Sequence, residues 1–129
     1  MAMNIASGAL PIVPLVLLKN NTANGDTSFT VDWTRYKVVI IQGKATGTGS
    51  MYLQIGGNDA GGVTTNSGCY VRSELLRDDL NTRVFSMLTA DSPTGNAGAV
   101  TTPADSTVGF RLVAATTKFE YVAFGVAIR

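Results

Sequence analysis

The chain has 129 residues, ten of them basic and nine acidic, and this length is typical of one domain with its own core. Only 15% of the residues are charged and the formal net charge is +1, so the basic excess that non-specific nucleic-acid binding requires is missing. Hydrophobic residues make up 45% of the chain, and their combination with low charge predicts apolar surface that another protein covers.

The first apolar segment is too short to span a membrane. Residues 9–18 are apolar and contain Pro11 and Pro14, whereas a transmembrane helix needs about 20 residues. Because proline favours extended backbone, we expect residues 1–11 to form an extended arm and residues 12–19 to form the first strand. The N-terminus lacks the basic segment of a secretory signal peptide, so we expect synthesis in the cytoplasm.

The rest of the chain alternates short β-prone runs with turn-forming residues. Within residues 27–33, Phe29, Val31 and Trp33 alternate with polar residues, which predicts a strand with one buried face. Residues 36–42 are apolar throughout their centre, which predicts a central strand buried on both faces. The same criteria predict further strands at residues 50–55, 69–76, 82–88, 108–114 and 118–128, the last of them inside a sheet.

Four segments lack the periodicity of a strand. Residues 20–26 and 43–49 predict turn-rich breaks between strands. Residues 56–68 contain five glycines and predict a long loop, as do residues 89–107 apart from one irregular edge strand near Val100. Long loops in compact domains are usually mobile or functional, so residues 56–68 are the most obvious contact surface.

About eight strands without helical periodicity or a sequence repeat predict an all-β fold. The expected architecture is an eight-stranded antiparallel jelly-roll-like β-sandwich, whose two sheets bury their inner faces against each other. An immunoglobulin-like sandwich is the alternative. We expect a single domain over residues 1–129.

The inventory of reactive side chains argues against catalysis. Without histidine, neither a Ser-His-Asp nor a Cys-His site can form, and a zinc ion lacks its usual ligands. A glycosidase would need two carboxylates on opposite sides of a sugar, and the nine acidic residues are scattered along the chain. We therefore expect no catalytic residues, no cofactor and no metal ion. The single cysteine, Cys69, is predicted to be a small buried hydrophobic residue.

The segment from Phe29 to Gly57 resembles a pattern that recurs in small β-rich structural proteins of tailed bacteriophages. An acidic-aromatic corner precedes Tyr-Lys-Val-Val-Ile-Ile at residues 36–41, and Met-Tyr-Leu-Gln-Ile at residues 51–55 runs into a Gly/Asp loop. A strand rich in Phe and Tyr, at residues 119–128, closes the chain. The resemblance implies a non-enzymatic protein of the virion, made in the host cytoplasm.

Among virion proteins, we favour a capsid decoration (cement) protein that stabilises the shell by bridging capsid subunits. A single compact domain lacks the coiled coils or repeats with which fibres extend. The implied partners are the major capsid protein or other virion proteins in a homo-oligomer, expected to be a trimer, with neither nucleic acid nor membrane as a partner. The contact residues expected in the arm are Leu10, Pro11, Ile12, Val13 and Pro14.

The alternative is a receptor- or glycan-binding module of a tail fibre or baseplate, in which the long loops form the binding surface. The residues of this hypothesis are Asn58, Asp59 and Asn66. A third hypothesis is an enzyme that uses carboxylates alone, with Glu74 as the residue to test.

Overall fold

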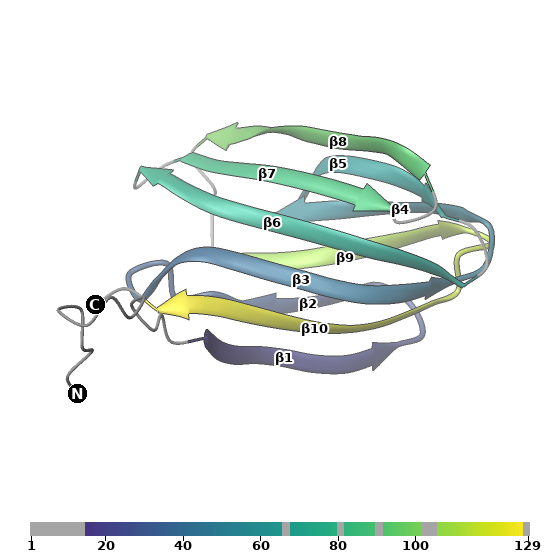
Figure 1. The fold of residues 1–129 in the computed structure, drawn as a ribbon, viewed down its shortest axis with the longest axis horizontal. Helices are drawn as coiled ribbons and strands as arrows, with labels where there is room; N and C mark the ends of the chain where they lie inside the picture. The colour runs from purple at the N-terminus through teal and green to yellow at the C-terminus, as the bar shows by residue number, and fades with distance from the viewer. Residues whose placement is uncertain (1–14, 66–67, 80–81, 90–91, 102–105, 128–129) are drawn as a thin grey trace, which may run out of the picture.

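The described residues form a sandwich of two antiparallel β-sheets (Figure 1). The computed structural model describes residues 15–65, 68–79, 82–89, 92–101 and 106–127. The strands are β1 (Leu15–Ala23), β2 (Thr27–Thr30), β3 (Tyr36–Thr46), β4 (Gly49–Ile55), β5 (Asn58–Thr65), β6 (Cys69–Asp79), β7 (Thr82–Thr89), β8 (Ser92–Thr101), β9 (Thr107–Ala114) and β10 (Lys118–Ala127). Within these ranges no helix is long and apolar enough to cross a membrane.

The strand order confirms the predicted jelly-roll-like sandwich. One sheet has the order β1-β10-β3-β6-β7-β8 and the other has the order β2-β9-β4-β5. When the β7–β8 hairpin is set aside, the chain passes from one sheet to the other at every connection except the β4–β5 hairpin. A chain that alternates in this way between two four-stranded sheets has the jelly-roll arrangement. β7 and β8 extend one of these sheets to six strands.

Two strands lie in the segments that the sequence predicted as long loops. Among the described strands, β5 occupies most of residues 56–68 and pairs only with β4. β8 confirms the edge strand predicted near Val100 but is longer than expected, and its described partner is β7 alone. Both are edge strands, which do not need the apolar alternation of a central strand. The two edges approach each other, and the Asn96 side-chain amide donates to the Gly62 carbonyl at 3.4 Å. Small residues permit this approach, because a Cβ on Gly61 would lie 2.7 Å from the Phe85 ring.

The first two strands differ from prediction in their ends. β1 begins at Leu15, and residues 12–14 of the predicted strand lie outside the described residues. β1 continues to Ala23 because the predicted turn residues pair with β10 instead. β2 ends at Thr30, and the chain then turns where the Thr34 backbone N–H and hydroxyl both donate to Asp32 Oδ1, at 3.1 and 2.6 Å. The predicted buried face is confirmed, since the buried side chains are Phe29, Val31 and Trp33.

The predicted break at residues 43–49 is shorter than expected, because β3 runs to Thr46. A Cβ on Gly43 would lie 2.4 Å from the Glu120 carbonyl oxygen and 2.7 Å from the Phe119 ring, so Gly43 serves close packing rather than a turn. The turn is made by Gly47, whose φ of 98° is in the region that favours glycine.

β3 and β10 are central strands, as predicted, but β3 is not buried on both faces. Val39 and Ile41 point into the core and are at most 1% exposed, whereas Val38 and Ile40 on the other face are only half-buried. The four-stranded sheet covers one face of β3, and no described strand covers the other.

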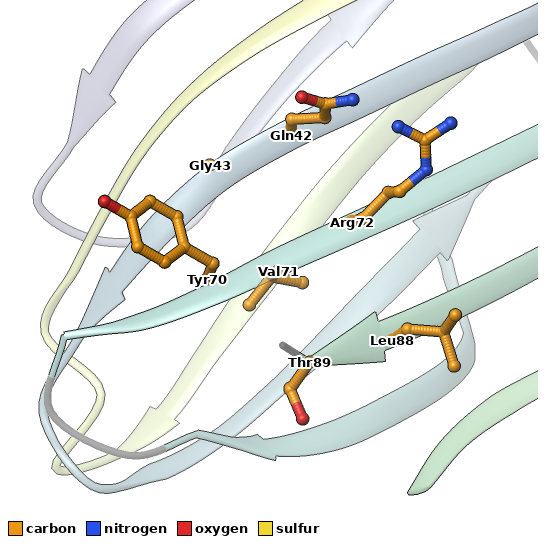
Figure 2. Close-up of a pocket in the computed structure, with 7 residues that line it drawn as sticks. All are labelled: Gln42, Gly43, Tyr70, Val71, Arg72, Leu88 and Thr89. Atoms are coloured by element: carbon orange, nitrogen blue, oxygen red, sulfur yellow. The ribbon is translucent and has the colours of Figure 1, made fainter. Parts of the chain in front are cut away.

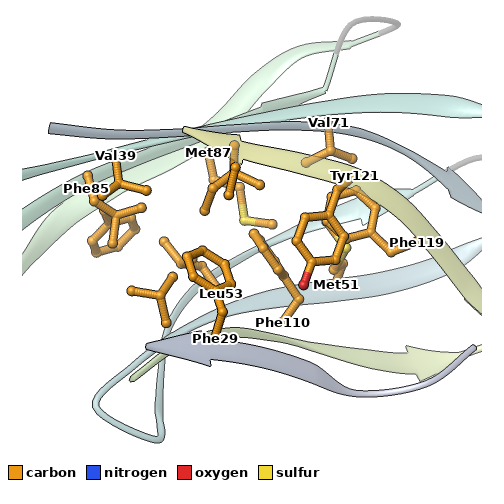
Figure 3. Close-up of a cluster of buried hydrophobic side chains, with 14 of the residues drawn as sticks. Phe29, Val39, Met51, Leu53, Val71, Phe85, Met87, Phe110, Phe119 and Tyr121 are labelled. Atoms are coloured by element: carbon orange, nitrogen blue, oxygen red, sulfur yellow. The ribbon is translucent and has the colours of Figure 1, made fainter. Parts of the chain in front are cut away.

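The core lies between the two sheets and includes an aromatic cluster (Figure 3). Phe110 comes from the four-stranded sheet, and its ring centroid lies 4.9 Å from that of Phe119 and 5.8 Å from that of Tyr121, both in β10. Burying one such side chain contributes about 1.5–3 kcal/mol. Cys69 is buried at the edge of this core, as the sequence predicted.

Candidate functional site

The contact residues expected from the sequence are only partly placed by the structure. Leu10, Pro11, Ile12, Val13, Pro14 and Asn66 lie outside the described residues. Asn58 and Asp59 are exposed at the start of β5, in a strand rather than in the predicted loop.

Asp59 takes part in a polar cluster on the outer face of the four-stranded sheet. Arg111 in β9 donates from Nε and Nη2 to the Asp59 carboxylate, with a shortest distance of 2.6 Å, and Gln54 donates to Asp59 Oδ1 at 3.0 Å. The Arg111 guanidinium also lies 4.6 Å from the centre of the Tyr52 ring. The hydrogen bonds from Arg111 lower the pKa of Asp59, and the same bonds raise the pKa of Arg111.

This cluster ties the edge strand β5 to β9 across β4. Both carboxylate oxygens of Asp59 already accept hydrogen bonds from protein side chains, and the guanidinium is held between that carboxylate and the Tyr52 ring. A ligand would have to displace these contacts before it could use either charge. We therefore interpret the cluster as a brace between strands.

The opposite outer face, that of the six-stranded sheet, is apolar over much of its width. Register places one row of side chains directly side by side across five neighbouring strands: Leu15, Val126, Val38, Leu76 and Val84. The next row begins with Leu17, Phe124 and Ile40 and continues with Glu74 and Ser86. We call the eight apolar side chains of these two rows the apolar band.

Exposed apolar side chains are concentrated on this face. The large hydrophobic side chains that are exposed among the described residues all belong to the outer face of the six-stranded sheet: Leu15, Leu17, Tyr70, Leu76, Val84 and Leu88. Leu15 is 59% exposed and Leu17 is 55% exposed. Apolar surface gathered on one side marks an interaction site more strongly than scattered single residues do.

Two open hollows lie on the same face. One, of about 420 Å³, lies over β6 and β7 and includes Val38, Leu76 and Val84 of the apolar band in its lining. The other, of about 390 Å³, is bordered by Gln42, Tyr70, Arg72 and Leu88, whose side chains are drawn in Figure 2. A partner's side chains can pack into these hollows, beside the protruding Leu and Tyr side chains.

Four of the charged side chains on this face form two neighbouring pairs of opposite sign, and Lys118 adds a fifth charge on the same face of β10. Arg72 and Glu74 form an ion pair in β6 with 3.5 Å between Nη2 and Oε2, and both are about half exposed. Lys44 in β3 is the direct strand partner of Glu120 in β10. The four side chains carry no net charge together.

The sequence contains a signal for this surface in residues 36–42 and 118–128, which are apolar on both faces. The place of residues 118–128 inside a sheet is confirmed, whereas the burial predicted for both faces of residues 36–42 is wrong. The described part of the chain supplies a cover for only one face.

The fold and this surface define a jelly-roll β-sandwich with one apolar outer face. Among the described residues, no three His, Cys, Asp or Glu side chains gather closely enough to hold a metal ion. No family model, curated protein or solved structure matches this chain.

Proposed function

We propose that this protein is a non-enzymatic structural protein of a bacteriophage virion, and specifically a capsid decoration (cement) protein. The observation that carries the proposal is the apolar band, because a soluble protein that places its exposed large hydrophobic side chains on one face works in contact with another protein. Two further features support it: the jelly roll recurs in viral capsid proteins, and the segment from Phe29 to Gly57 resembles phage structural proteins.

Decoration would stabilise a shell by burying surface across several of its subunits. Separating those subunits would then also require breaking their contacts with the decoration protein. Residues 10–14 are proposed to supply part of this contact. They directly precede Leu15 in the apolar band, so an arm bound to a neighbour would be continuous with the apolar face.

The tail-receptor alternative receives less support. Its proposed loop contains the edge strand β5, and the carboxylate of Asp59 is already held by Arg111 and Gln54. A glycan would therefore meet an occupied acidic group at this position.

Co-sedimentation tests the proposal. The protein is mixed separately with undecorated phage shells and with host cells, and bound protein is measured in the pellet. We expect saturable pelleting with shells, loss of pelleting when residues 1–11 are removed, and unchanged pelleting for the control Asp59→Ala, which alters the opposite sheet. Pelleting with cells but not with shells would reject decoration and move the function to host recognition.

A further inference from the structure

We infer that Asn24 is a site of spontaneous covalent modification, at which the folded chain converts an asparagine into aspartate and isoaspartate. The site lies in the connection between β1 and β2, which joins the six-stranded sheet to the four-stranded sheet (Figure 1). The inference goes beyond the proposed function and does not depend on it, because Asn24 lies outside the apolar band.

The reaction needs only the chain and water. The backbone nitrogen of Gly25 attacks the side-chain carbonyl carbon of Asn24, and the new N–C bond closes a succinimide ring. The side-chain amide leaves as ammonia, which carries away the proton of the Gly25 N–H. Water then breaks one of the two bonds between the ring nitrogen and a carbonyl carbon. Breaking the bond to the side-chain carbon gives aspartate, and breaking the bond to the main-chain carbon gives isoaspartate, so nothing is oxidised or reduced.

A glycine after the asparagine favours this ring closure. A side chain on the following residue crowds the attacking nitrogen and restricts the backbone conformations in which the ring can close, whereas glycine imposes neither restriction. Asn24-Gly25 is the one Asn-Gly pair in the sequence. The residue types therefore place the most reactive asparagine at this position.

The structure leaves the reacting groups of this pair unconstrained. Asn24 is exposed, and both residues lie in a bend outside the strands. Among the described residues, neither the Asn24 side chain nor the Gly25 N–H has a hydrogen-bond partner. A Cβ placed on Gly25 would meet no atom within 4 Å beyond its chain neighbours, so no other segment obstructs the approach of the two groups.

The other asparagines in the described ranges lack this combination. Asn20, Asn21, Asn58 and Asn96 lie in strands, and a residue with a side chain follows each of them. Strand pairing holds their backbone extended. Three of the four side chains also donate hydrogen bonds within the fold. The fold therefore protects these asparagines and leaves Asn24 open.

The products change the charge and the covalent geometry of the connection. Each product adds one carboxylate to a chain whose formal net charge is +1, so the modified chain is formally neutral and more prone to associate. Isoaspartate also adds a methylene group to the backbone. Two residues later, Asp26 Oδ1 accepts from the Leu112 backbone N–H at 2.9 Å, so the change occurs beside a contact that ties the connection to β9.

The test follows the folded full chain over time at physiological temperature in mildly alkaline buffer. We expect an acidic species to accumulate and to migrate in charge separation with the variant Asn24→Asp. Its mass change should map to Asn24 in the tryptic peptide of residues 20–35, and an isoaspartyl methyltransferase should label the isoaspartate fraction.

Two variants separate this reaction from other sources of charge. Gly25→Ala has room for its methyl group and should slow the modification of Asn24 at least about tenfold. Asn24→Gln should abolish the acidic species, because its longer side chain closes a six-membered ring far more slowly. A Gly25→Ala variant that is modified at the native rate, or a mass change that maps to another asparagine, would overturn the inference.

A further comparison keeps the inference testable if Gly25→Ala fails to fold. The native chain is incubated both folded and unfolded in urea, and the rate of modification at Asn24 is measured in each state. We expect comparable rates, because the fold gives neither reacting group a partner. A chain that is modified at Asn24 only when unfolded would overturn the inference.

Discussion

Thr65 lies fully buried at the end of β5, where three parts of the chain meet. Its hydroxyl donates to the Gly47 carbonyl at 3.1 Å and accepts from the Gly49 backbone N–H at 3.3 Å. The Thr116 hydroxyl lies 2.7 Å away and must be the donor in that pair, because Thr65 has a single hydroxyl proton. One side chain thus joins the β3–β4 turn, the end of β5 and the β9–β10 turn.

Thr65→Val should therefore be costly although it preserves shape. The substitution removes the hydroxyl while the three groups bonded to it remain in place, and a buried polar group that loses its partner costs about 1–3 kcal/mol. We expect a loss of that size in the free energy of unfolding, measured by urea denaturation. Thr64→Val, on the exposed face of the same strand, should change it little. Equal stabilities for the two variants would contradict this role of Thr65.

At the scale of elements, the edge strand β5 depends on the brace formed by Asp59, Arg111 and Tyr52. The hydrogen bonds from Arg111 favour the ionised carboxylate, so the pKa of Asp59 is lower in the folded state than in the unfolded state. A lowered folded pKa means that the brace stabilises the fold above the unfolded pKa of about 3.9 and loses this effect as the pH falls through the folded value.

Asp59→Asn should consequently flatten the acid dependence of stability. Because both charged side chains are 38% exposed, solvent screens the pair, and we expect a difference in urea midpoint on the order of 0.2 M at pH 7 that shrinks as the pH falls below the unfolded pKa of about 3.9. The control Asp78→Asn changes an exposed carboxylate in β6. If the urea midpoints of the native chain and Asp59→Asn differed more at pH 3 than at pH 7, this role of Asp59 would be contradicted.

The central strands and the edge strands β1 and β2 could be predicted from sequence, whereas β5 and most of β8 could not. β3 and β10 consist of apolar β-prone residues whose preference and position agree, so their existence and central place follow from composition. β5 and β8 are rich in Gly, Thr, Asn and Ala, and their strand form comes from pairing with β4 and β7 rather than from their own pattern. Gly43 was predicted to lie in a turn but lies in β3. Close packing against Phe119 and a turn both require glycine, so the residue type alone does not distinguish the two.

The composition predicted apolar surface that another protein covers, but the place and the members of the apolar band could not be predicted, for a related reason. Its members come from five strands, and only register brings Leu15, Val38 and Val84 into one row. The sequence did indicate that both faces of β3 are apolar, but not that the described strands of the sandwich cover only one of them. Of the residues predicted to bind partners, only Asn58 and Asp59 lie in the described ranges, and Asp59 serves as a brace.

At the scale of the whole molecule, the two outer faces differ in character. One bears the Asp59–Arg111 brace and polar side chains, and the other gathers the exposed Leu, Val and Tyr side chains. An exposed apolar face is unfavourable for a small domain unless a partner protein covers that face. We therefore expect the protein to contribute stability to an assembly rather than chemistry to a substrate.

Scanning calorimetry of undecorated phage shells, with and without saturating amounts of this protein, tests that central claim most directly. If the protein cements the shell, the temperature at which the shell disrupts should rise with protein concentration and then level off when the sites are filled, because binding stabilises the state that binds. Val84→Lys places a charge in the apolar band, so this variant should raise the disruption temperature less than the native chain does. An unchanged disruption temperature at saturating protein would contradict a decoration role.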